Sequence, residues 1–387
     1  MKLAASAKQK PTPPRYLRRY LTIAGMAMWL LLVGLGVMVW LLHSQGIINA
    51  WQFPLKSIAA FAGGGGLACF GLARIWGFWR YPRQQILRRI AGFIAIAFAI
   101  LNLLAFAFAY GTTHFVPPGS IGFGLPRSQN DRLPTDFGLE YTVDRIQKSE
   151  SEWLETWFIA AENQPAKGTV LLFPGQGGSK GKQLLAPAQV LHSLGYDALL
   201  VDFRGVGGSS GSTSTIGVRE AKDVALAVDY ARQLPSQVQE RSPLILYGIS
   251  MGSAAIVRAI ARENVTLDAI VLELPFSRLI DAVKVRLAAR RIPPFPLAEL
   301  IVFWGGIQHG FNGFAHNPIA YARQVECPTL ILHGEVDRWM SLAQIDELLA
   351  NFAGETELAI FPDTGHQLLV TVDREFWGQS IDAFLDR

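Results

Sequence analysis

The stretch LILYGISMGSAA, residues 244–255, decides the fold class of this chain. Its first half is a run of apolar residues typical of a buried strand, and the residues after it have the small, apolar composition of a packed helix. Ser250 stands between them, flanked by Gly248 and Gly252 in the pattern G-x-S-x-G. Glycines are needed around so sharp a strand-to-helix turn, because side chains there would collide with the neighbouring strand and helix. The turn therefore predicts a serine hydroxyl held out for chemistry, and a tight turn without chemistry is the alternative.

Short apolar runs recur after residue 136, and amphipathic helical patterns separate the later ones. Such alternation indicates an α/β fold with a mostly parallel eight-stranded sheet and helices on both faces. We expect the first two strands to form an antiparallel hairpin at the sheet edge. The predicted strands are 138–147, 153–160, 168–173, 197–202, 243–247, 268–274, 328–333 and 357–361, and the predicted helices are 182–193, 217–233, 251–262, 342–353 and 374–386.

Two of the later strands are followed by side chains that can activate a serine. A serine hydroxyl is a poor nucleophile, so it needs a base, and the base needs an orienting acid. Asp337 lies just beyond the strand predicted to end at His333, and His366 follows the final strand. Each has an alternative role, since Asp337 can cap a helix and His366 can lie on a surface turn. Glu335 and Asp363 are neighbouring acids, and His333 is interpreted as a packed core histidine.

The order Ser, Asp, His at successive strand ends resembles that of the α/β-hydrolase superfamily. The chain looks most like its serine-aminopeptidase-like and deacetylase-like single-domain serine hydrolases, and the resemblance covers about 134–387. It implies Ser250 as nucleophile, His366 as general base and then acid, and Asp337 as the orienting carboxylate. The segments that carry it are PTDFGLEY, LLFPGQGG, GYDALLVDFRGVGGSSG, YGISMGSAA, PTLILHGEVD and DTGH.

The resemblance also implies an oxyanion hole made of two backbone N–H groups. One belongs to the residue after the nucleophile, which is Met251 here, and the other to Gln176 in the turn after the strand at 168–173. Pro174 stands where the family usually has histidine, and this departure leaves the N–H of Gln176 intact. Losing one such donor typically costs about 2.7–4 kcal/mol of transition-state stabilisation.

Residues 277–325 form a long, aromatic-rich insertion between two predicted strands. We interpret this segment as a small helical lid over the serine, with Phe295, Phe303, Trp304 and Phe311 as walls of an acyl pocket. Ordinary helix packing is the alternative interpretation of these four aromatic residues.

The first part of the chain has the composition of a membrane region. Residues 1–130 contain 13 of the 35 Lys and Arg residues and none of the 31 Asp and Glu residues. Three apolar runs, at 21–42, 57–79 and 90–110, predict an all-α transmembrane region over 21–110. The middle run contains four consecutive glycines and Arg74, so a re-entrant segment is its alternative. A Pro- and Gly-rich linker at 111–135 and a hydrolase domain at 136–387 follow.

The distribution of basic residues predicts the orientation of this region. Residues 1–20 and the segment 80–89 are rich in Lys and Arg, whereas the loop at about 43–56 has a single Lys. Positive charge marks the cytoplasmic side. Three crossings then place the hydrolase domain on the non-cytoplasmic side, whereas two crossings would leave the basic segment 80–89 facing outward.

Composition and motifs also argue against several classes of protein. The part after residue 130 is acidic on balance, so it would repel nucleic-acid phosphates. Cys69 and Cys327 give neither a disulfide framework nor a metal site. The sequence GQGGSKGK at 175–182 lacks the spacing of a phosphate-binding loop. We therefore expect no metal, no cofactor and no nucleic-acid partner.

The sequence thus predicts a membrane-anchored serine hydrolase that cleaves a carboxylic ester through an acyl-enzyme. The expected substrate is a small or lipid-like acyl compound, because the membrane brings acyl lipids within reach. Thioester or peptide cleavage by the same three residues is an alternative. A non-catalytic binding or scaffold module with a vestigial triad is an alternative of another class, since one fold serves many functions.

Overall fold

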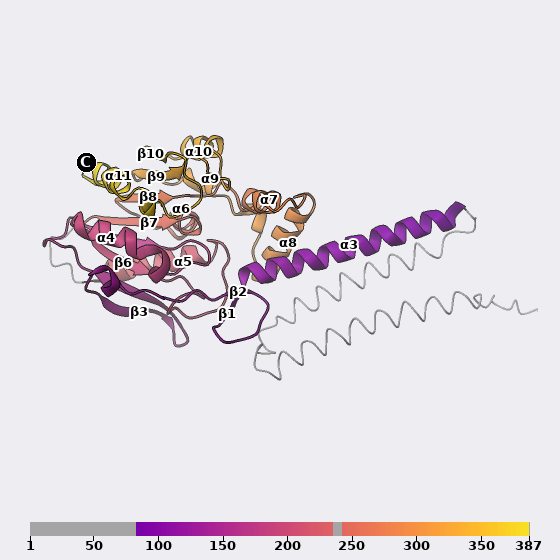
Figure 1. Ribbon diagram of the computed structural model, residues 1–387, viewed down its shortest axis with the longest axis horizontal. Coiled ribbons are helices and arrows are strands. Elements are labelled where there is room, and N and C mark those ends of the chain that lie inside the picture. Colours follow the sequence, from indigo (N-terminus) through magenta and orange to yellow (C-terminus); the bar gives the residue numbers. More distant parts are fainter. Residues whose placement is uncertain (1–82, 235–241, 387) are drawn as a thin grey trace, which may run out of the picture. The chain divides into compact units, whose positions relative to one another are not determined.

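The computed structural model describes residues 83–234 and 242–386 (Figure 1). The chain divides into two units, Met1–Ala60 and Phe61–Arg387, and every described residue belongs to the second. The basic segment predicted at 1–20, the membrane helices predicted at 21–42 and 57–79, and Cys69 lie outside the described residues.

An eight-stranded sheet forms the centre of the described unit, as predicted. Its strand order is β10-β9-β8-β7-β5-β6-β4-β3. The pairs β3–β4 and β4–β6 are antiparallel and all other pairs are parallel, so the predicted hairpin does lie at the edge. The strands are β3 Thr142–Ser149, β4 Glu152–Ile159, β5 Thr169–Phe173, β6 Asp197–Val201, β7 Leu244–Ile249, β8 Ala269–Glu273, β9 Thr329–Gly334 and β10 Thr356–Phe361.

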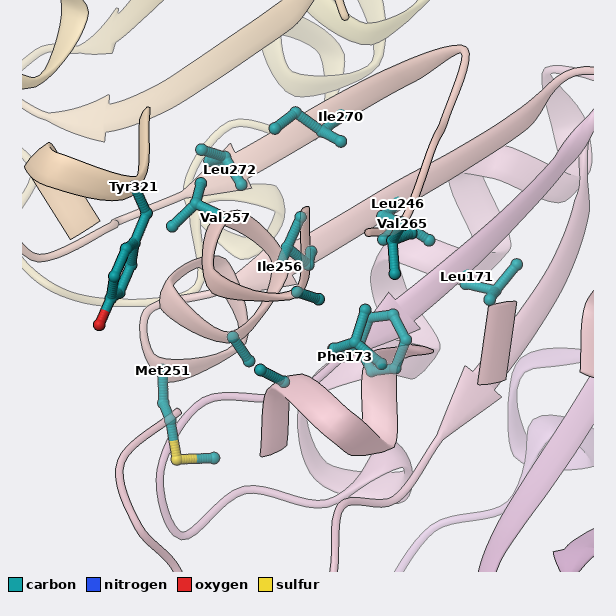
Figure 2. Close-up of a cluster of buried hydrophobic side chains, with 14 of the residues drawn as sticks. Leu171, Phe173, Leu246, Met251, Ile256, Val257, Val265, Ile270, Leu272 and Tyr321 are labelled. Atoms are coloured by element: carbon teal, nitrogen blue, oxygen red, sulfur yellow. The ribbon is translucent and has the colours of Figure 1, made fainter. Parts of the chain in front are cut away.

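The central strands are apolar throughout because both faces of the sheet are covered. In β5, Leu171 and Phe173 face one buried cluster while Val170 and Leu172 face the other. Helices α5 (Glu220–Ala231), α6 (Met251–Glu263) and α10 (Leu342–Leu349) cover the first face, part of which Figure 2 shows. Helices α4 (Leu185–Ser193) and α11 (Arg374–Leu385) cover the second. Alternate side chains of a central strand therefore point into two different hydrophobic cores, one on each face of the sheet.

Several element boundaries differ from the prediction by a few residues, and two of them have a clear local reason. Strand β3 begins at Thr142, later than expected, because Pro134–Phe137 form a 3-10 turn that ends at Gly138 with a φ of 73°. Helix α5 begins at Glu220 rather than at residue 217. The Glu220 carboxylate accepts hydrogen bonds from the backbone N–H groups of Thr215 and Gly217, and these bonds hold the preceding residues in a loop.

The insertion at 277–325 is helical, as expected. It contains α7 (Leu279–Ala289), α8 (Leu297–His309), a 3-10 turn at Gly313–Ala315 and the short helix α9 (Pro318–Ala322). Helix α8 lies beside helix α3 (Figure 1). A small core of Ala105, Ala109, Leu287, Ala298 and Ile301 joins α3, α7 and α8.

Helix α3, Arg83–Thr113, contains the apolar run predicted at 90–110. Its segment Ile90–Thr113 is long and apolar enough to cross a membrane. Large apolar side chains on this segment, such as Phe93 and Ile96, are exposed. The helix continues into the segment expected to be a linker, where β1 (Phe115–Val116) and β2 (Leu125–Pro126) also pair.

A buried ion cluster fixes residues 127–132 to the domain. The Nζ of Lys180 lies 2.5 Å from Oδ2 of Asp202 and 2.9 Å from Oε1 of Glu155, and the side chain of Lys180 has no exposed surface. Asp202 also accepts hydrogen bonds from Nδ2 of Asn130 and from the backbone N–H of Gly208. One carboxylate thus ties β6, the loop after it and the segment before β3 together.

Replacing Lys180 by methionine tests this cluster. Lys180→Met leaves the Asp202 carboxylate buried without its cation, so we expect the free energy of unfolding to fall by about 3–5 kcal/mol. Lys182→Met is the matched control, since the Nζ of Lys182 forms only an exposed pair with Asp131 at 3.3 Å, and its loss should be below about 1 kcal/mol. Chemical denaturation in detergent measures both values, and equal losses would contradict the assignment.

Candidate active site

Ser250 occupies the sharp turn between β7 and α6 and has φ 51° and ψ −102°. A Cβ built on Gly248 would lie 2.6 Å from the carbonyl carbon of Gly252, and one built on Gly252 would lie 2.6 Å from the carbonyl oxygen of Phe173. No side chain fits at either position, so the two glycines are a packing requirement. The backbone N–H of Ser250 donates to the carbonyl of Glu273 at 2.8 Å, which fixes the turn to the neighbouring strand.

The structure brings Ser250, His366 and Asp337 into one hydrogen-bonded chain. Nε2 of His366 lies 3.2 Å from Oγ of Ser250, and Nδ1 of His366 lies 2.7 Å from Oδ2 of Asp337. The Asp337 side chain is fully buried, and its Oδ1 accepts from the backbone N–H of Trp339 at 2.7 Å. Because a carboxylate only accepts, Nδ1 of His366 carries the hydrogen and Nε2 is free to take the hydroxyl proton of Ser250.

The neighbouring candidate residues have other partners. Oε2 of Glu335 accepts from the backbone N–H of Asp363 at 3.0 Å, so these two acids stabilise their own turn. Nε2 of His333 contacts the carbonyl of Met340 at 3.1 Å, and burial lowers the pKa of this histidine. His333 is therefore a packed, neutral residue. Within the described ranges, no group of three or more His, Cys, Asp or Glu side chains is arranged to hold a metal ion.

The turn after β5 lies directly beside the serine. A Cβ built on Gly175 would lie 3.6 Å from Cβ of Ser250. The backbone N–H of Gly175 is fixed by Oε1 of Gln183, and Nε2 of Gln176 donates to the carbonyl of Thr112 at 3.0 Å. Across the described part of the chain, the backbone N–H groups of Gln176 and Met251 have no protein acceptor. Both remain available to an oxygen bound beside Ser250.

Glu273, at the end of β8, is a buried residue that the sequence reasoning did not identify. Its carboxylate accepts hydrogen bonds from the Tyr247 hydroxyl at 2.6 Å, from Nε1 of Trp377 at 2.8 Å and from the backbone N–H of Leu369 at 2.8 Å. Burial nevertheless raises the pKa of Glu273. Its backbone holds Ser250 and its side chain holds the segment after His366, so one residue positions both. The signal in the sequence that points to Glu273 is its charge at the end of the otherwise apolar strand AIVLE.

The four aromatic residues predicted to form an acyl pocket have different environments. Phe311 lines a pocket bounded by α3, α7, α8 and the loop before α5. Phe295 and Phe303 are exposed, by 78% and 47%. The ring of Trp304 packs against Phe106 of α3, and its Nε1 donates to Oδ1 of Asn102 at 3.1 Å. Phe311 therefore lines this pocket and the other three do not, because the insertion packs against α3, a contact that no local pattern reveals.

Comparison with known proteins agrees with this architecture. A family model described as serine aminopeptidase, S33, matches residues 164–301. The crystal structure of the Pyrococcus furiosus esterase Pf2001 superposes with a TM-score of 0.57 at 22% identity, covering 68% of this chain and 96% of that one. The chain has the α/β-hydrolase fold.

Two curated relatives each match about half of the chain. Protein YqkD of Bacillus subtilis is 26% identical over 195 residues, which cover 50% of this chain and 63% of that protein. A Danio rerio protein named lysophosphatidylserine lipase ABHD12 is 27% identical over 201 residues, which cover 49% of this chain and 47% of that protein. The matched segment is thus less than two thirds of either relative.

Two buried histidines, His309 and His316, allow a prediction of how the stability of this chain depends on pH. Burial lowers the pKa of each to about 4, from an ordinary value of 6.5. The unfolded chain therefore takes up protons between pH 6.5 and 4 that the folded chain does not, and stability falls as the pH falls through this range. By pH 5 the loss should be about 2 kcal/mol for each histidine.

The measurement is denaturant unfolding at pH 7.5 and pH 5, compared between the wild-type protein and His316→Gln. The variant keeps a donor for the carbonyl of Ile216, which Nε2 of His316 contacts at 2.9 Å. On acidification to pH 5 it should lose about 2 kcal/mol less stability than the wild type. An unchanged pH dependence in His316→Gln would contradict the assignment.

Proposed function

We propose that this chain is a membrane-anchored serine hydrolase that cleaves carboxylic esters through an acyl-enzyme. The observation that carries the proposal is the hydrogen-bonded chain from Asp337 through His366 to Ser250. Its three members follow three different strands and meet at the carboxyl edge of the sheet, where ligands bind in open α/β folds. Such a chain supplies the nucleophile, base and orienting acid that acyl transfer requires.

The reaction begins with attack of Oγ of Ser250 on the acyl carbonyl carbon while Nε2 of His366 takes the hydroxyl proton. Asp337 stabilises the imidazolium through Nδ1. The N–H groups of Gln176 and Met251 stabilise the oxyanion of the tetrahedral intermediate. His366 then gives its proton to the departing alcohol, and the C–O bond to that alcohol breaks.

The second half of the reaction uses the same groups with water as the nucleophile. His366 takes a proton from water, the resulting hydroxide attacks the acyl carbon, and the proton passes to Oγ of Ser250 as the acid leaves. The 3.2 Å separation of Nε2 and Oγ allows these transfers without a large movement of either side chain. No redox change occurs, so the chemistry calls for no electron carrier.

Ester substrates are favoured over the alternatives by two kinds of support. One curated relative is named a lysophosphatidylserine lipase and one solved structure with the same fold is an esterase. The exposed apolar surface of α3 also favours acyl lipids as neighbours of the domain. Thioester and peptide cleavage use the same groups, and the family description serine aminopeptidase keeps a peptidase as the second candidate.

The proposed anchor includes α3, whose segment Ile90–Thr113 satisfies the length and polarity of a membrane span. With the apolar runs at 21–42 and 57–79 it gives three crossings. The basic segments at 1–20 and 80–89 then lie in the cytoplasm and the hydrolase domain on the other side.

The nucleophile is tested by labelling with a fluorophosphonate, which reacts with activated serines. We expect the wild-type protein to be labelled and Ser250→Ala not to be, while the matched control Ser193→Ala is labelled like the wild type. Asp337→Asn should lower kcat about 10⁴-fold, because the imidazole loses the partner that fixes its tautomer. Equal labelling of the wild type and Ser250→Ala, or labelling of neither, would favour a non-catalytic binding module.

The topology is tested by single-cysteine labelling in sealed right-side-out vesicles. Cys69 and Cys327 are first replaced by alanine, and a cysteine is then introduced at Glu150, in the exposed turn between β3 and β4. We expect Glu150→Cys to react with a membrane-impermeant maleimide and the control Ser6→Cys to be protected. Protection of Glu150→Cys until the vesicles are opened would reject the three-crossing arrangement.

A further inference from the structure

A pocket lies between the C-terminal end of α3, the helices α7 and α8, and the loop before α5. Its empty volume is about 420 Å³, part of it open to solvent. Most of the lining is apolar and comes from Ile216, Leu279, Val283, Ile301, Val302 and Phe311.

The polar groups at the wall of this pocket are already paired with protein atoms. Oγ1 of Thr113 donates to the carbonyl of Ala109 at 2.7 Å and lies 2.9 Å from Nε2 of His309. Oγ1 of Thr215 donates to Glu220 at 2.6 Å. Among the residues that the structure describes, the lining contains no Asp, Glu, Lys or Arg. An uncharged hydrocarbon suits such a cavity better than a polar or ionic ligand.

Two lining residues contact elements that hold the proposed reacting groups. Ile216 packs against Ala254, which lies one helical turn after Ser250 in α6. The carbonyl of Thr112, another lining residue, accepts from Nε2 of Gln176, whose N–H is proposed to bind the oxyanion. Ile216 and Ala254 thus connect the pocket to the serine turn, and Thr112 connects it to the turn that holds Gln176.

Small residues leave the space between α3 and α8 open. A Cβ built on Gly305 of α8 would meet only Cβ of Ala109, at 3.8 Å. Gly306 has no such room, because a Cβ there would lie 2.5 Å from the carbonyl of Phe311. Towards the N-terminus, α3 exposes apolar side chains such as Phe93, Ile96 and Phe98. One helix thus presents apolar surface to its surroundings at one end and lines the pocket at the other.

We propose that this pocket binds the straight-chain acyl group of the substrate, and that the end of the membrane helix α3 forms one of its walls. The proposal rests on the proposed hydrolase function and adds the acyl-binding site to it. Gly305 and Phe311 determine the chain length that fits. Each methylene buried in the pocket should raise kcat/KM about fourfold until the space is filled.

Gly305→Leu tests the site by filling the pocket from α8. We expect kcat/KM for p-nitrophenyl dodecanoate to fall about 60-fold or more, as three or more buried methylenes are lost, while that for the butyrate stays within about twofold. Phe303→Leu, on the exposed side of the same helix, is the matched control and should change neither value. Fluorophosphonate labelling of each variant shows that Ser250 and its partners are intact.

If Gly305→Leu is still labelled, an equal loss of kcat/KM on both esters would overturn the proposal. No loss on either ester would overturn it as well. If the fluorophosphonate does not label Gly305→Leu, Phe311→Ala tests the site instead. Enlarging the pocket should shift the substrate preference towards esters with longer acyl chains. An unchanged preference would overturn the proposal. Failure of the hydrolase function is distinguishable, since the wild type would then cleave neither ester.

If the wild type cleaves neither ester, photo-cross-linking of a fatty acid that carries a diazirine group tests binding to the pocket in Ser250→Ala. Cross-linking should occur in the segment from α8 to Phe311. Its loss in Gly305→Leu together with its retention in Phe303→Leu would support the site without any catalysis. Equal cross-linking in both variants, or none, overturns it.

Discussion

The close approach of α6 to the ends of β5 and β7 is the constraint on which the rest of the site depends. The helix can begin immediately after the strand only because Gly248 and Gly252 carry no side chains at this contact. Ser250 adopts a positive φ there, which costs a non-glycine residue roughly 1–3 kcal/mol. Hydrogen bonds from the Ser250 N–H to Glu273 and from the Ser253 hydroxyl to the carbonyl of Gly248 hold the turn in place.

Buried carboxylates hold the loops around this turn. Glu273 connects the serine turn to the segment after His366, Asp202 with Lys180 fixes the loop after β6, and Glu220 fixes the loop before α5. Each lies at or near the end of a strand or helix, where backbone N–H groups are available as donors. Such satisfied networks position loops more tightly than apolar contacts do, because a misplaced partner leaves a buried charge unpaired.

Helix α3 links the apolar N-terminal part of the chain to the domain that carries the serine. It packs on α8 through Ala105 and Ala109, and Gln308 and Trp304 of α8 donate hydrogen bonds to it. In the proposed function this packing places the acyl site next to the hydrocarbon from which a lipid substrate would come. Anchoring and substrate selection would then depend on the same helix.

Local patterns in the sequence determined the strands, the main helices and the candidates Ser250, Asp337 and His366. Strand and turn periodicity is a local property, and the carboxyl ends of parallel strands necessarily share one edge of the sheet. The hydrogen bonds among these residues, the role of Glu273 and the actual neighbours of Phe295, Phe303 and Trp304 were decided only by the tertiary structure. They depend on contacts between segments far apart in the chain, such as α3 against α8, and those contacts leave no periodic signal in either segment.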